Sequence, residues 1–192
     1  MSICQPLTAE RWDDLERLFG AQGACDGCWC MWFRLSGAQF HAGAGVQNRA
    51  ALRQLVERGM PTGLIAYAGH EPVGWCAVAP REQLSRLQRS ALVRASDGAR
   101  IDAAPVWSIT CFYVPTAKRR RGVARTLVRG AIAYAWAGGA TSIEAYPRDP
   151  QIGPVGPGSA YVGLLQLFAS EGFVEVARTS PARVIVRLLR PA

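Results

Sequence analysis

The sequence predicts an α/β fold in which helices and strands alternate around one mixed sheet. Two apolar runs, at 63–68 and 73–79, are separated by a short turn containing Gly and Pro, which predicts a β-hairpin. A third run, 106–114, is rich in β-branched and aromatic residues and predicts a core strand. Apolar residues then recur at helical spacing over 122–137. The length of 192 residues fits one domain, 1–192, with a substantial core.

The N-terminal third is expected to hold one strand and two helices. Residues 3–7 suggest the strand, and apolar residues at helical spacing predict helices over 8–19 and roughly 46–58. The segment 24–35 is rich in cysteine and aromatic residues and is predicted to be irregular. A loop is expected over 37–45, where glycines recur.

A long polar connection, 80–104, follows the hairpin and is expected to serve the functional site, with a short helix near 82–88. Proline and glycine then separate the helical and strand patterns toward the C-terminus. The remaining elements are expected in this order: a strand at 142–146, a loop at 147–158, a helix at 159–171, and strands near 173–178 and 182–189.

A basic turn containing one glycine separates the 106–114 strand from the helix that follows it. Such a turn presents backbone N–H groups and the positive end of the helix dipole, which together suit an anion. Neither a Walker loop nor the three-glycine dinucleotide fingerprint occurs there. The turn and the first helical turns carry cations without any acid, which favours a ligand with several phosphates. The cations are Lys118, Arg119, Arg120, Arg121, Arg125 and Arg129.

The spacing Arg119-x-x-Gly122-x-Ala124 resembles the signature of the GNAT superfamily of acyl-CoA N-acyltransferases, which is Gln/Arg-x-x-Gly-x-Gly/Ala after a strand. The predicted last helix ends in Gly172-Phe173 before a strand, which is also similar to that family. The resemblance covers residues 62–178 well and the N-terminal third in outline. It implies a mostly antiparallel sheet flanked by helices, acetyl-CoA as co-substrate, and acetyl transfer to a primary amine of a small molecule or peptide.

The resemblance also implies how acetyl-CoA would lie on this chain. The pantetheine arm would pair with the backbone of the core strand, and the pyrophosphate would accept hydrogen bonds from the N–H groups of the turn. Gly122 and Ala124 would let a phosphate approach closely, because neither carries a bulky side chain. The implied cofactor-binding residues are Phe112, Tyr113, Val114, Arg119, Arg120, Arg121, Gly122, Val123 and Ala124.

Acetyl transfer needs a deprotonated amine, a polarised thioester carbonyl and a proton for the departing thiolate. The family often supplies that proton from a tyrosine four residues before the Gly of Gly-Phe, and this chain has Phe168 there. Tyr161 stands where the family has an asparagine. On a continuous helix Tyr161 would lie two turns from Phe168, on the same face, and would reach the cleft.

Two residues of the 142–146 strand complete the catalytic candidates. Tyr146 is a second candidate acid, and Glu144 is the candidate base. They are separated by one residue and therefore project from one face of the strand. Each has a structural alternative, which is a packed aromatic ring for either tyrosine and a salt-bridged or solvent-facing carboxylate for Glu144.

The acceptor site is expected to be shaped by 1–60, by the 80–104 connection and by the 147–160 loop. Tryptophans in or near these segments offer flat apolar walls that would suit a bulky or aromatic amine. Two of them belong to predicted strands and are therefore core candidates first. The four tryptophans are Trp29, Trp32, Trp75 and Trp107.

Six cysteines are expected to be free thiols rather than a disulfide framework. Cys25, Cys28 and Cys30 form a short cluster that lacks the second ligand pair of a structural zinc site. We therefore predict that they bind no metal and are buried or line a pocket. Cys111 could suggest an acyl-cysteine, but no histidine lies near it in the sequence to activate the thiol, and core packing explains it better.

The formal net charge is +8, from 22 basic and 14 acidic residues. A nucleic-acid partner is unsupported because no helix carries a long basic stripe with interleaved aromatic residues. No apolar run reaches transmembrane length and no signal peptide is evident, so no membrane partner and a cytoplasmic location are expected. Three alternatives stay open: a CoA-binding sensor with little catalysis, suggested by Phe168, a basic nucleic-acid-binding protein, and a homodimer.

Overall fold

The computed structural model describes residues 2–97, 105–156 and 160–191. Seven strands form one sheet in this part of the chain. They are β1 (Ser2–Pro6), β2 (Gly63–Ala68), β3 (Glu71–Pro80), β4 (Val106–Tyr113), β5 (Ser142–Ala145), β6 (Val174–Ser180) and β7 (Arg183–Leu189). Their order is β1-β2-β3-β4-β5-β7-β6, with β4 and β5 parallel and all other neighbours antiparallel. The predicted mixed, mostly antiparallel sheet is confirmed.

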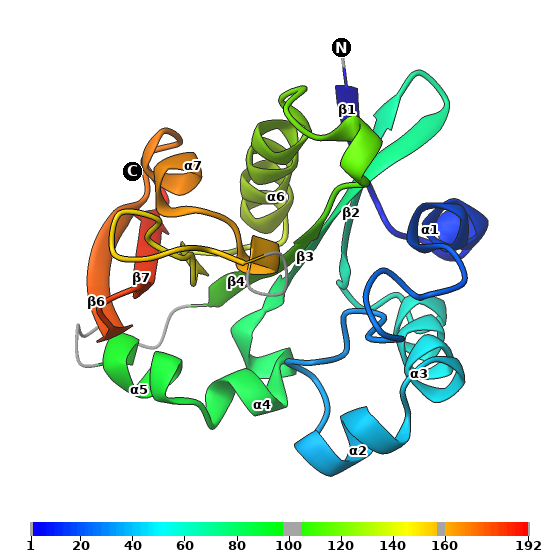
Figure 1. Ribbon diagram of the computed structural model, residues 1–192, viewed down its shortest axis with the longest axis horizontal. Coiled ribbons are helices and arrows are strands. Elements are labelled where there is room, and N and C mark those ends of the chain that lie inside the picture. Colours follow the sequence, from blue (N-terminus) through cyan, green and yellow to red (C-terminus); the bar gives the residue numbers. More distant parts are fainter. Residues whose placement is uncertain (1, 98–104, 157–159, 192) are drawn as a thin grey trace.

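Helices cover both faces of this sheet (Figure 1). The α-helices are α1 (Trp12–Phe19), α2 (Gly37–Ala42), α3 (Val46–Glu57), α4 (Ser85–Gln88), α5 (Ala91–Asp97), α6 (Val123–Ala137) and α7 (Leu165–Ala169). The short 3-10 helices are η1 (Ala9–Arg11), η2 (Arg81–Gln83), η3 (Thr116–Lys118) and η4 (Ala160–Val162). Among the described residues, no helix combines the length and the apolar composition needed to cross a membrane.

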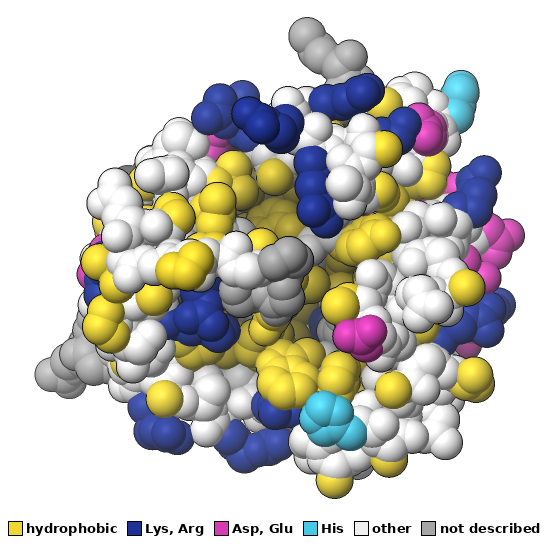
Figure 2. Space-filling model, in the orientation of Figure 1, with side chains coloured by type: hydrophobic (Ala, Val, Ile, Leu, Met, Phe, Trp, Pro, Cys, Tyr) yellow, Lys and Arg dark blue, Asp and Glu magenta, His cyan; other side chains and the backbone are white. Residues whose placement is uncertain are grey.

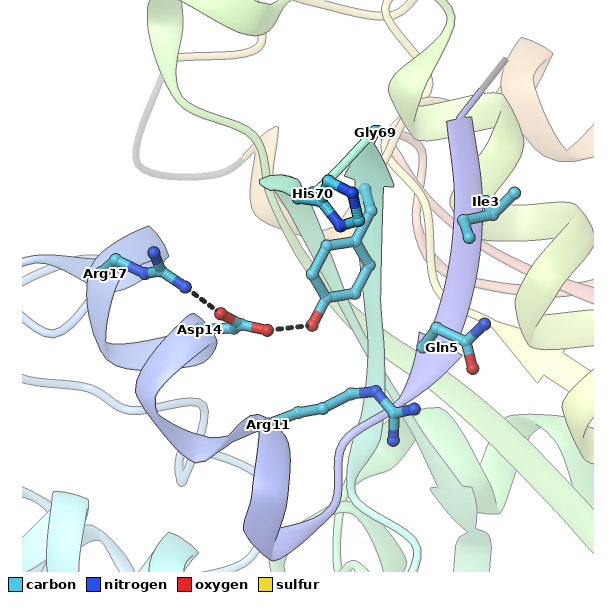
Figure 3. A pocket seen from close by; sticks show the side chains of 8 residues that line it. Ile3, Gln5, Arg11, Asp14, Arg17, Gly69 and His70 are labelled. Carbon is cyan, nitrogen blue, oxygen red and sulfur yellow. Dashed lines mark hydrogen bonds and ion pairs between the residues drawn. The ribbon is translucent and has the colours of Figure 1, made fainter.

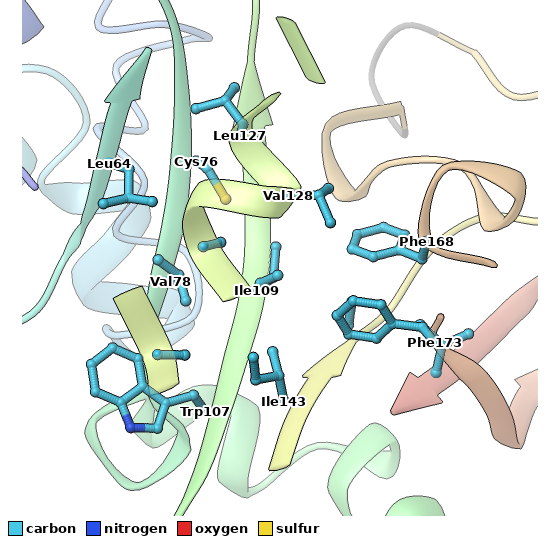
Figure 4. Packing of buried hydrophobic residues seen from close by; sticks show 14 of the residues in the cluster. Leu64, Cys76, Val78, Trp107, Ile109, Leu127, Val128, Ile143, Phe168 and Phe173 are labelled. Atoms are coloured by element: carbon cyan, nitrogen blue, oxygen red, sulfur yellow. The ribbon is translucent and has the colours of Figure 1, made fainter. Parts of the chain in front are cut away.

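The core on one face of the sheet forms between the strands and helices α6 and α7 (Figure 4). Helix α6 forms because its apolar residues recur at helical spacing and bury one stripe against β2, β3 and β4. Phe168 from α7 and Phe173 join the same cluster and pack edge to face. The buried residues of α6 are Val123, Leu127, Val128, Ala131 and Ala135.

The opposite face of the sheet carries two further apolar clusters. Helices α1 and α3 pack on the β1–β4 half, around the fully buried Trp75. Helices α4 and α5 pack on the β5–β7 half, around Tyr146 and Ile185. The predicted helix over 8–19 begins as η1 and continues as α1, whose residues Trp12, Leu15, Leu18 and Phe19 are buried. The N-terminal segment therefore lies on the face opposite α6.

Strand β4 changes its surroundings half-way along its length. Val106–Ile109 pairs with β5 on one side and with β3 on the other. A bulge against β3 falls between Ile109 and Cys111, which leaves Thr110 without a register partner. Because a bulge shifts the alternation of side chains, Cys111 faces the α1 side while Phe112 faces the α6 side. Beyond Ile109, no described strand pairs with the β5 side of β4.

Two sequence-based predictions of local structure are wrong. The segment predicted as a loop over 37–45 contains helix α2, which Ser36 begins with a capping box to Gln39. The helix predicted over 159–171 is broken into η4 and α7. Gly163 has a φ of +83° at the break, and its carbonyl accepts from the backbone N–H of Arg148 instead of continuing a helix.

Candidate active site

A basic pocket lies at the N-terminus of α6. Gly122 is the N-cap residue and adopts a left-handed conformation with a φ of +79°, which glycine adopts without steric cost. The first backbone N–H groups of an α-helix have no acceptor within the helix, so they are available to a ligand here. The pocket has a volume of about 320 Å³. It is lined by Val114, Lys118, Arg119, Arg120, Gly122, Val123, Ala124, Arg125 and Leu167.

Most residues of the predicted phosphate turn therefore meet in one pocket, but the tertiary structure changes their charge balance. Lys118 pairs with Glu71 at 2.7 Å. Arg125 and Arg129 both pair with Glu171, at 3.4 and 2.8 Å. Acids distant in the sequence thus partly neutralise three of the six cations.

The guanidinium groups that remain for a phosphate come mainly from the turn itself. The Nε of Arg119 donates to the backbone carbonyl of Val114 at 3.0 Å. Arg120 and Arg121 are exposed and make no ion pair within the described part of the chain. Arg120 lines the pocket and adopts a φ of +61°, whereas Arg121 is absent from the lining. The positive φ at two positions of one turn directs several backbone N–H groups toward the same space.

The unpaired side of β4 leads from this pocket into the molecule. Val114 lines the pocket, and Phe112 and Tyr113 precede it on the stretch of β4 that no longer pairs with β5. On its other side this stretch is held by β3, where Phe112 is in register with Cys76 and Tyr113 with Trp75. The backbone groups on the unpaired side can therefore bind an extended ligand as an added strand would.

The segment with Tyr161 packs against this stretch of β4. A Cβ placed on Gly163 would approach Phe112 at 3.4 Å, which shows how closely the two segments pack. Tyr161 is half-buried, and burial raises the pKa of its phenol, while Arg183 and Arg148 act in the opposite direction. Its phenol also interacts with Cys111. Tyr161 thus lies beside β4 although the predicted continuous helix is wrong.

Glu144 and Tyr146 lie in a buried polar network instead. The Glu144 carboxylate is fully buried, and the Arg187 guanidinium donates to it at 2.6 and 3.2 Å. Arg81 donates to the other oxygen at 3.3 Å, and the Tyr146 hydroxyl donates to it at 3.0 Å. Ser108 lies 2.9 Å from the same hydroxyl. Tyr146 is fully buried, and desolvation followed by the Glu144 charge raises the pKa of its phenol.

The face that carries the pocket and β4 is hollowed near its centre (Figure 2). Hydrophobic side chains form the floor of the hollow, and Lys and Arg side chains are prominent around its rim. A concave apolar surface with a few charged groups around it is the usual form of a small-molecule site.

Comparison with known proteins shows which family this chain belongs to. The family model described as the acetyltransferase (GNAT) family matches residues 29–153, which is more than half of the chain. The chain belongs to the GNAT acetyltransferase family. It is therefore an acyltransferase, as the resemblance of the turn implied. Among curated proteins, none matches the sequence.

Solved structures with the same fold are distant in sequence. The PaiA N-acetyltransferase from Thermoplasma acidophilum, in complex with coenzyme A, aligns with a TM-score of 0.55 at 13% identity, covering 99% of each chain. A GNAT-family acetyltransferase from Streptococcus agalactiae gives a TM-score of 0.59 at 10% identity, covering 100% of this chain and 96% of that one. The ribosomal-protein-alanine N-acetyltransferase from Brucella melitensis gives 0.53 at 16%, covering 98% and 99%.

At the position where GNAT enzymes often have a tyrosine, Phe168 is a core residue of this chain. Its side chain is fully buried between Phe112 and Phe173, with ring centroids 5.9 and 5.3 Å away. A hydroxyl here would be enclosed by aromatic rings rather than aimed at a substrate. The catalytic roles of Glu144, Tyr146 and Tyr161 stay predictions, and burial favours a structural role for the first two.

The cluster of Cys25, Cys28 and Cys30 packs against β4 through Cys30. The Cys30 Sγ lies 3.5 Å from the Cys111 Sγ and accepts from the Trp75 indole N–H at 3.2 Å. All six cysteines are free. The hydrogen bond that Cys30 donates to Cys111, together with burial, raises the pKa of Cys30, and the Cys30 contact raises the pKa of Cys28. These thiols therefore stay protonated and pack as small apolar groups.

We expect the purified protein to contain no stoichiometric zinc and to keep its melting temperature in a chelator. Zinc binds thiolates, and the contacts described above stabilise the neutral thiols of Cys28 and Cys30. Within the described residues, no group of three or more His, Cys, Asp and Glu side chains could hold a metal ion. Elemental analysis that finds one zinc per chain, lost together with stability, would contradict this expectation.

The predicted tryptophan walls are mostly part of the core. Trp75 and Trp29 are buried on the α1 side, and Trp107 is buried on the α6 side, against Tyr134. Of the four, Trp32 alone is only half-buried, and the Arg86 guanidinium stacks over its ring at 3.5 Å from the centroid. This contact joins the N-terminal segment to α4 of the 80–104 connection.

A second pocket, of about 450 Å³, lies between β1, the β2–β3 turn and α1 and shares no residue with the first (Figure 3). The Asp14 carboxylate in it accepts from the Tyr67 hydroxyl at 2.7 Å and from Arg17. The Tyr67 hydrogen bond lowers the pKa of Asp14, and burial raises the pKa of Tyr67. These polar groups satisfy one another, and we assign the pocket no role in catalysis.

Proposed function

We propose that this GNAT acyltransferase moves an acetyl group from acetyl-CoA to a primary amine of a small molecule or peptide, as one domain acting in the cytoplasm. The observation that carries the proposal is the continuity between the basic pocket at the N-terminus of α6 and the unpaired side of β4. A pyrophosphate fits the first and an extended pantetheine arm fits the second. The coenzyme A in the Thermoplasma acidophilum structure supports this assignment.

The cofactor-binding roles follow from this placement. The backbone N–H groups of Val123 and Ala124 would hold the pyrophosphate at the N-cap formed by Gly122, and Arg119 and Arg120 would add charge. The backbone of Phe112–Val114 would bind the pantetheine arm. Arg121 is a weaker candidate than Arg120, because its side chain does not line the pocket.

Tyr161 is proposed to donate the proton that the departing thiolate needs. Acetyl-CoA supplies the activated thioester, and the chain holds it and protonates the departing thiolate. The raised pKa of Tyr161 keeps the phenol protonated at neutral pH, and Arg183 beside it favours the approach of a thiolate. Glu144 and Tyr146 are proposed to be structural, because their polar groups bind one another within the core. The amine would then lose its proton to water.

The substitution Tyr161→Phe is expected to lower kcat by about 10²-fold, the usual range for a general acid, with little change in affinity for CoA. Phenylalanine keeps the ring that packs on the apolar cluster and removes only the hydroxyl. Steady-state turnover assays measure kcat, and titration with CoA measures the affinity separately. Tyr146→Phe is the matched control for loss of a buried phenol and should reduce stability rather than kcat. Full activity of Tyr161→Phe would leave catalysis to proximity and carbonyl polarisation.

The proposed function is tested by incubating the protein with acetyl-CoA and a panel of primary amines and measuring the free thiol released. We expect amine-dependent release, with an acidic limb of the pH profile that moves with the pKa of the amine. CoA binding without release for any amine would favour a CoA-binding sensor instead. Salt-sensitive binding to duplex DNA that CoA does not affect would favour a nucleic-acid-binding protein.

The acceptor is proposed to bind between the N-terminal segment 1–60, the 80–104 connection and the 147–160 loop. In the described parts of these segments, the backbone N–H of Arg86 donates to the Phe33 carbonyl at 3.0 Å, and the Ser85 hydroxyl donates to the Arg34 carbonyl at 2.7 Å. These contacts fix the two segments together on the face that carries Tyr161. A homodimer stays a prediction.

A further inference from the structure

Two arginines, Arg148 and Arg183, lie side by side next to Tyr161. The backbone of Arg148 forms bridges to Leu164 and to Arg183, which leads into β7. The Arg148 N–H donates to the Gly163 carbonyl at 3.0 Å, so the arginine is anchored to the segment that carries Tyr161. Residues in register on paired strands project from the same face, so the two guanidinium groups are neighbours.

The two guanidinium groups have no acid partner among the described side chains. Both side chains are half-buried, and the Nε atoms of Arg148 and Arg183 are inaccessible and lack a hydrogen-bond acceptor within the described residues. The like charge of Arg148 and burial both lower the pKa of Arg183, with burial the larger cause. Buried charges are normally paired, so two adjacent unpaired cations need a counter-charge from elsewhere.

The acids around this pair are bound to other cations. Asp149 follows Arg148, but its carboxylate pairs with Arg178 at 3.1 Å and accepts from the Gln151 N–H. Glu175 pairs with Arg178 as well, at 2.8 Å. No described acid is left to neutralise the two arginines. This exclusion of acids concerns the side chains that the structure describes, those of residues 3–96, 105–156 and 160–191.

The pair is also close to the expected reaction centre. Arg183 interacts with the Tyr161 phenol, and that phenol interacts with Cys111 on β4. Cys111 lies three residues, or about 10 Å, before Val114, the β4 residue that reaches the phosphate pocket. The phosphates and the two arginines would therefore lie at opposite ends of the pantetheine arm, so CoA phosphate would not neutralise this pair.

We propose that Arg148 and Arg183 bind an oxyanion on the acceptor, so that the enzyme acetylates amines that also carry a carboxylate or a phosphate monoester. The inference rests on the proposed function, because it names the acceptor class of the same site. Two adjacent guanidinium groups suit either oxyanion, since each can donate paired N–H groups to it. The tyrosine and the anion site would then orient the amine from two sides.

The test measures binding rather than turnover, by calorimetric titration of the protein with and without saturating CoA. One ligand pair is N-acetyl-L-phenylalanine and its neutral amide, and the other is phenyl phosphate and benzyl alcohol. The variants are Arg148→Gln, Arg183→Gln and Arg148→Lys, with Arg190→Gln as the control for net charge. Arg190 is exposed, and its guanidinium donates to the Trp136 carbonyl on the α6 side. Arg120→Gln reports any anion bound at the phosphate turn, because Arg120 lines that pocket.

We expect at least one anion to bind the wild-type protein about tenfold or more tightly than its neutral counterpart. Arg148→Gln and Arg183→Gln should each weaken that anion about tenfold or more and leave the neutral ligand unchanged, because charge-assisted hydrogen bonds are lost. Arg148→Lys should retain part of the preference, which keeps the test decisive should Arg183→Gln fail to fold. Preference for the carboxylate or for the phosphate identifies the acceptor class.

Three results would overturn the inference: equal binding of anion and neutral ligand, an equal loss in Arg190→Gln, or a loss that follows Arg120→Gln alone. Absence of saturable binding of either anion counts as the first of these results. The proposed function fails separately. If anions bind as expected but no amine releases free thiol from acetyl-CoA, the anion site stands and the acyl transfer to amines does not.

Discussion

Replacement of Gly122 by glutamate is expected to abolish CoA binding while the fold stays intact. A Cβ on Gly122 would meet no protein atom within 4 Å, so the new side chain has room and projects from the turn beside the pocket. Its carboxylate would then repel the pyrophosphate that the N–H groups and arginines are proposed to bind. The left-handed φ of +79° adds a conformational cost of about 1–2 kcal/mol for a residue with a Cβ.

The matched control is Gly122→Gln, which has the same size and the same backbone cost without the charge. We expect Gly122→Glu to lose CoA affinity by about 100-fold or more and Gly122→Gln to lose much less, because charge-assisted hydrogen bonds contribute about 1.5–3 kcal/mol each. Calorimetric titration with CoA and thermal unfolding measure binding and stability separately. Wild-type affinity in a folded Gly122→Glu protein would show that the phosphate site is elsewhere.

The second large effect concerns stability. Glu144→Gln is expected to reduce the free energy of unfolding by about 3–5 kcal/mol, the range for breaking a buried ion pair from one side. The reason is that the Arg187 guanidinium, only 6% exposed, would lose its carboxylate partner at 2.6 Å. Arg81 would lose its ion pair to the same carboxylate. Urea denaturation measures the difference.

Glu57→Gln is the matched control for the same change of side chain. Its carboxylate pairs with Arg53 one helical turn away, and both side chains are about half exposed, so the expected loss is below about 0.5 kcal/mol. The two losses together separate the effect of burial from the effect of the substitution itself. Unchanged stability of Glu144→Gln, combined with loss of the acidic limb of the pH profile, would identify Glu144 as the catalytic base.

The sequence by itself determined the features that depend on local patterns. Helix α6 follows from one apolar stripe that ends at Gly138, and the β2–β3 hairpin follows from two apolar runs around one turn. The phosphate turn was also predictable. A strand, a glycine that must adopt a positive φ, and a helix N-terminus are contiguous in the chain, so their geometry depends on a few neighbouring residues.

Only the tertiary structure decided which groups meet across the chain. Glu71 and Glu171 partly neutralise three cations of the turn, and nothing near the turn in the sequence indicates either acid. For Glu144 the sequence left open a catalytic base or a salt-bridged carboxylate, and only the structure shows that it is paired with Arg187. Pairing of Gly163–Leu165 with Arg148 replaces a continuous helix and puts Tyr161 beside β4. Burial, ion pairing and strand register arise from contacts between distant segments, and a local pattern carries no information on those partners.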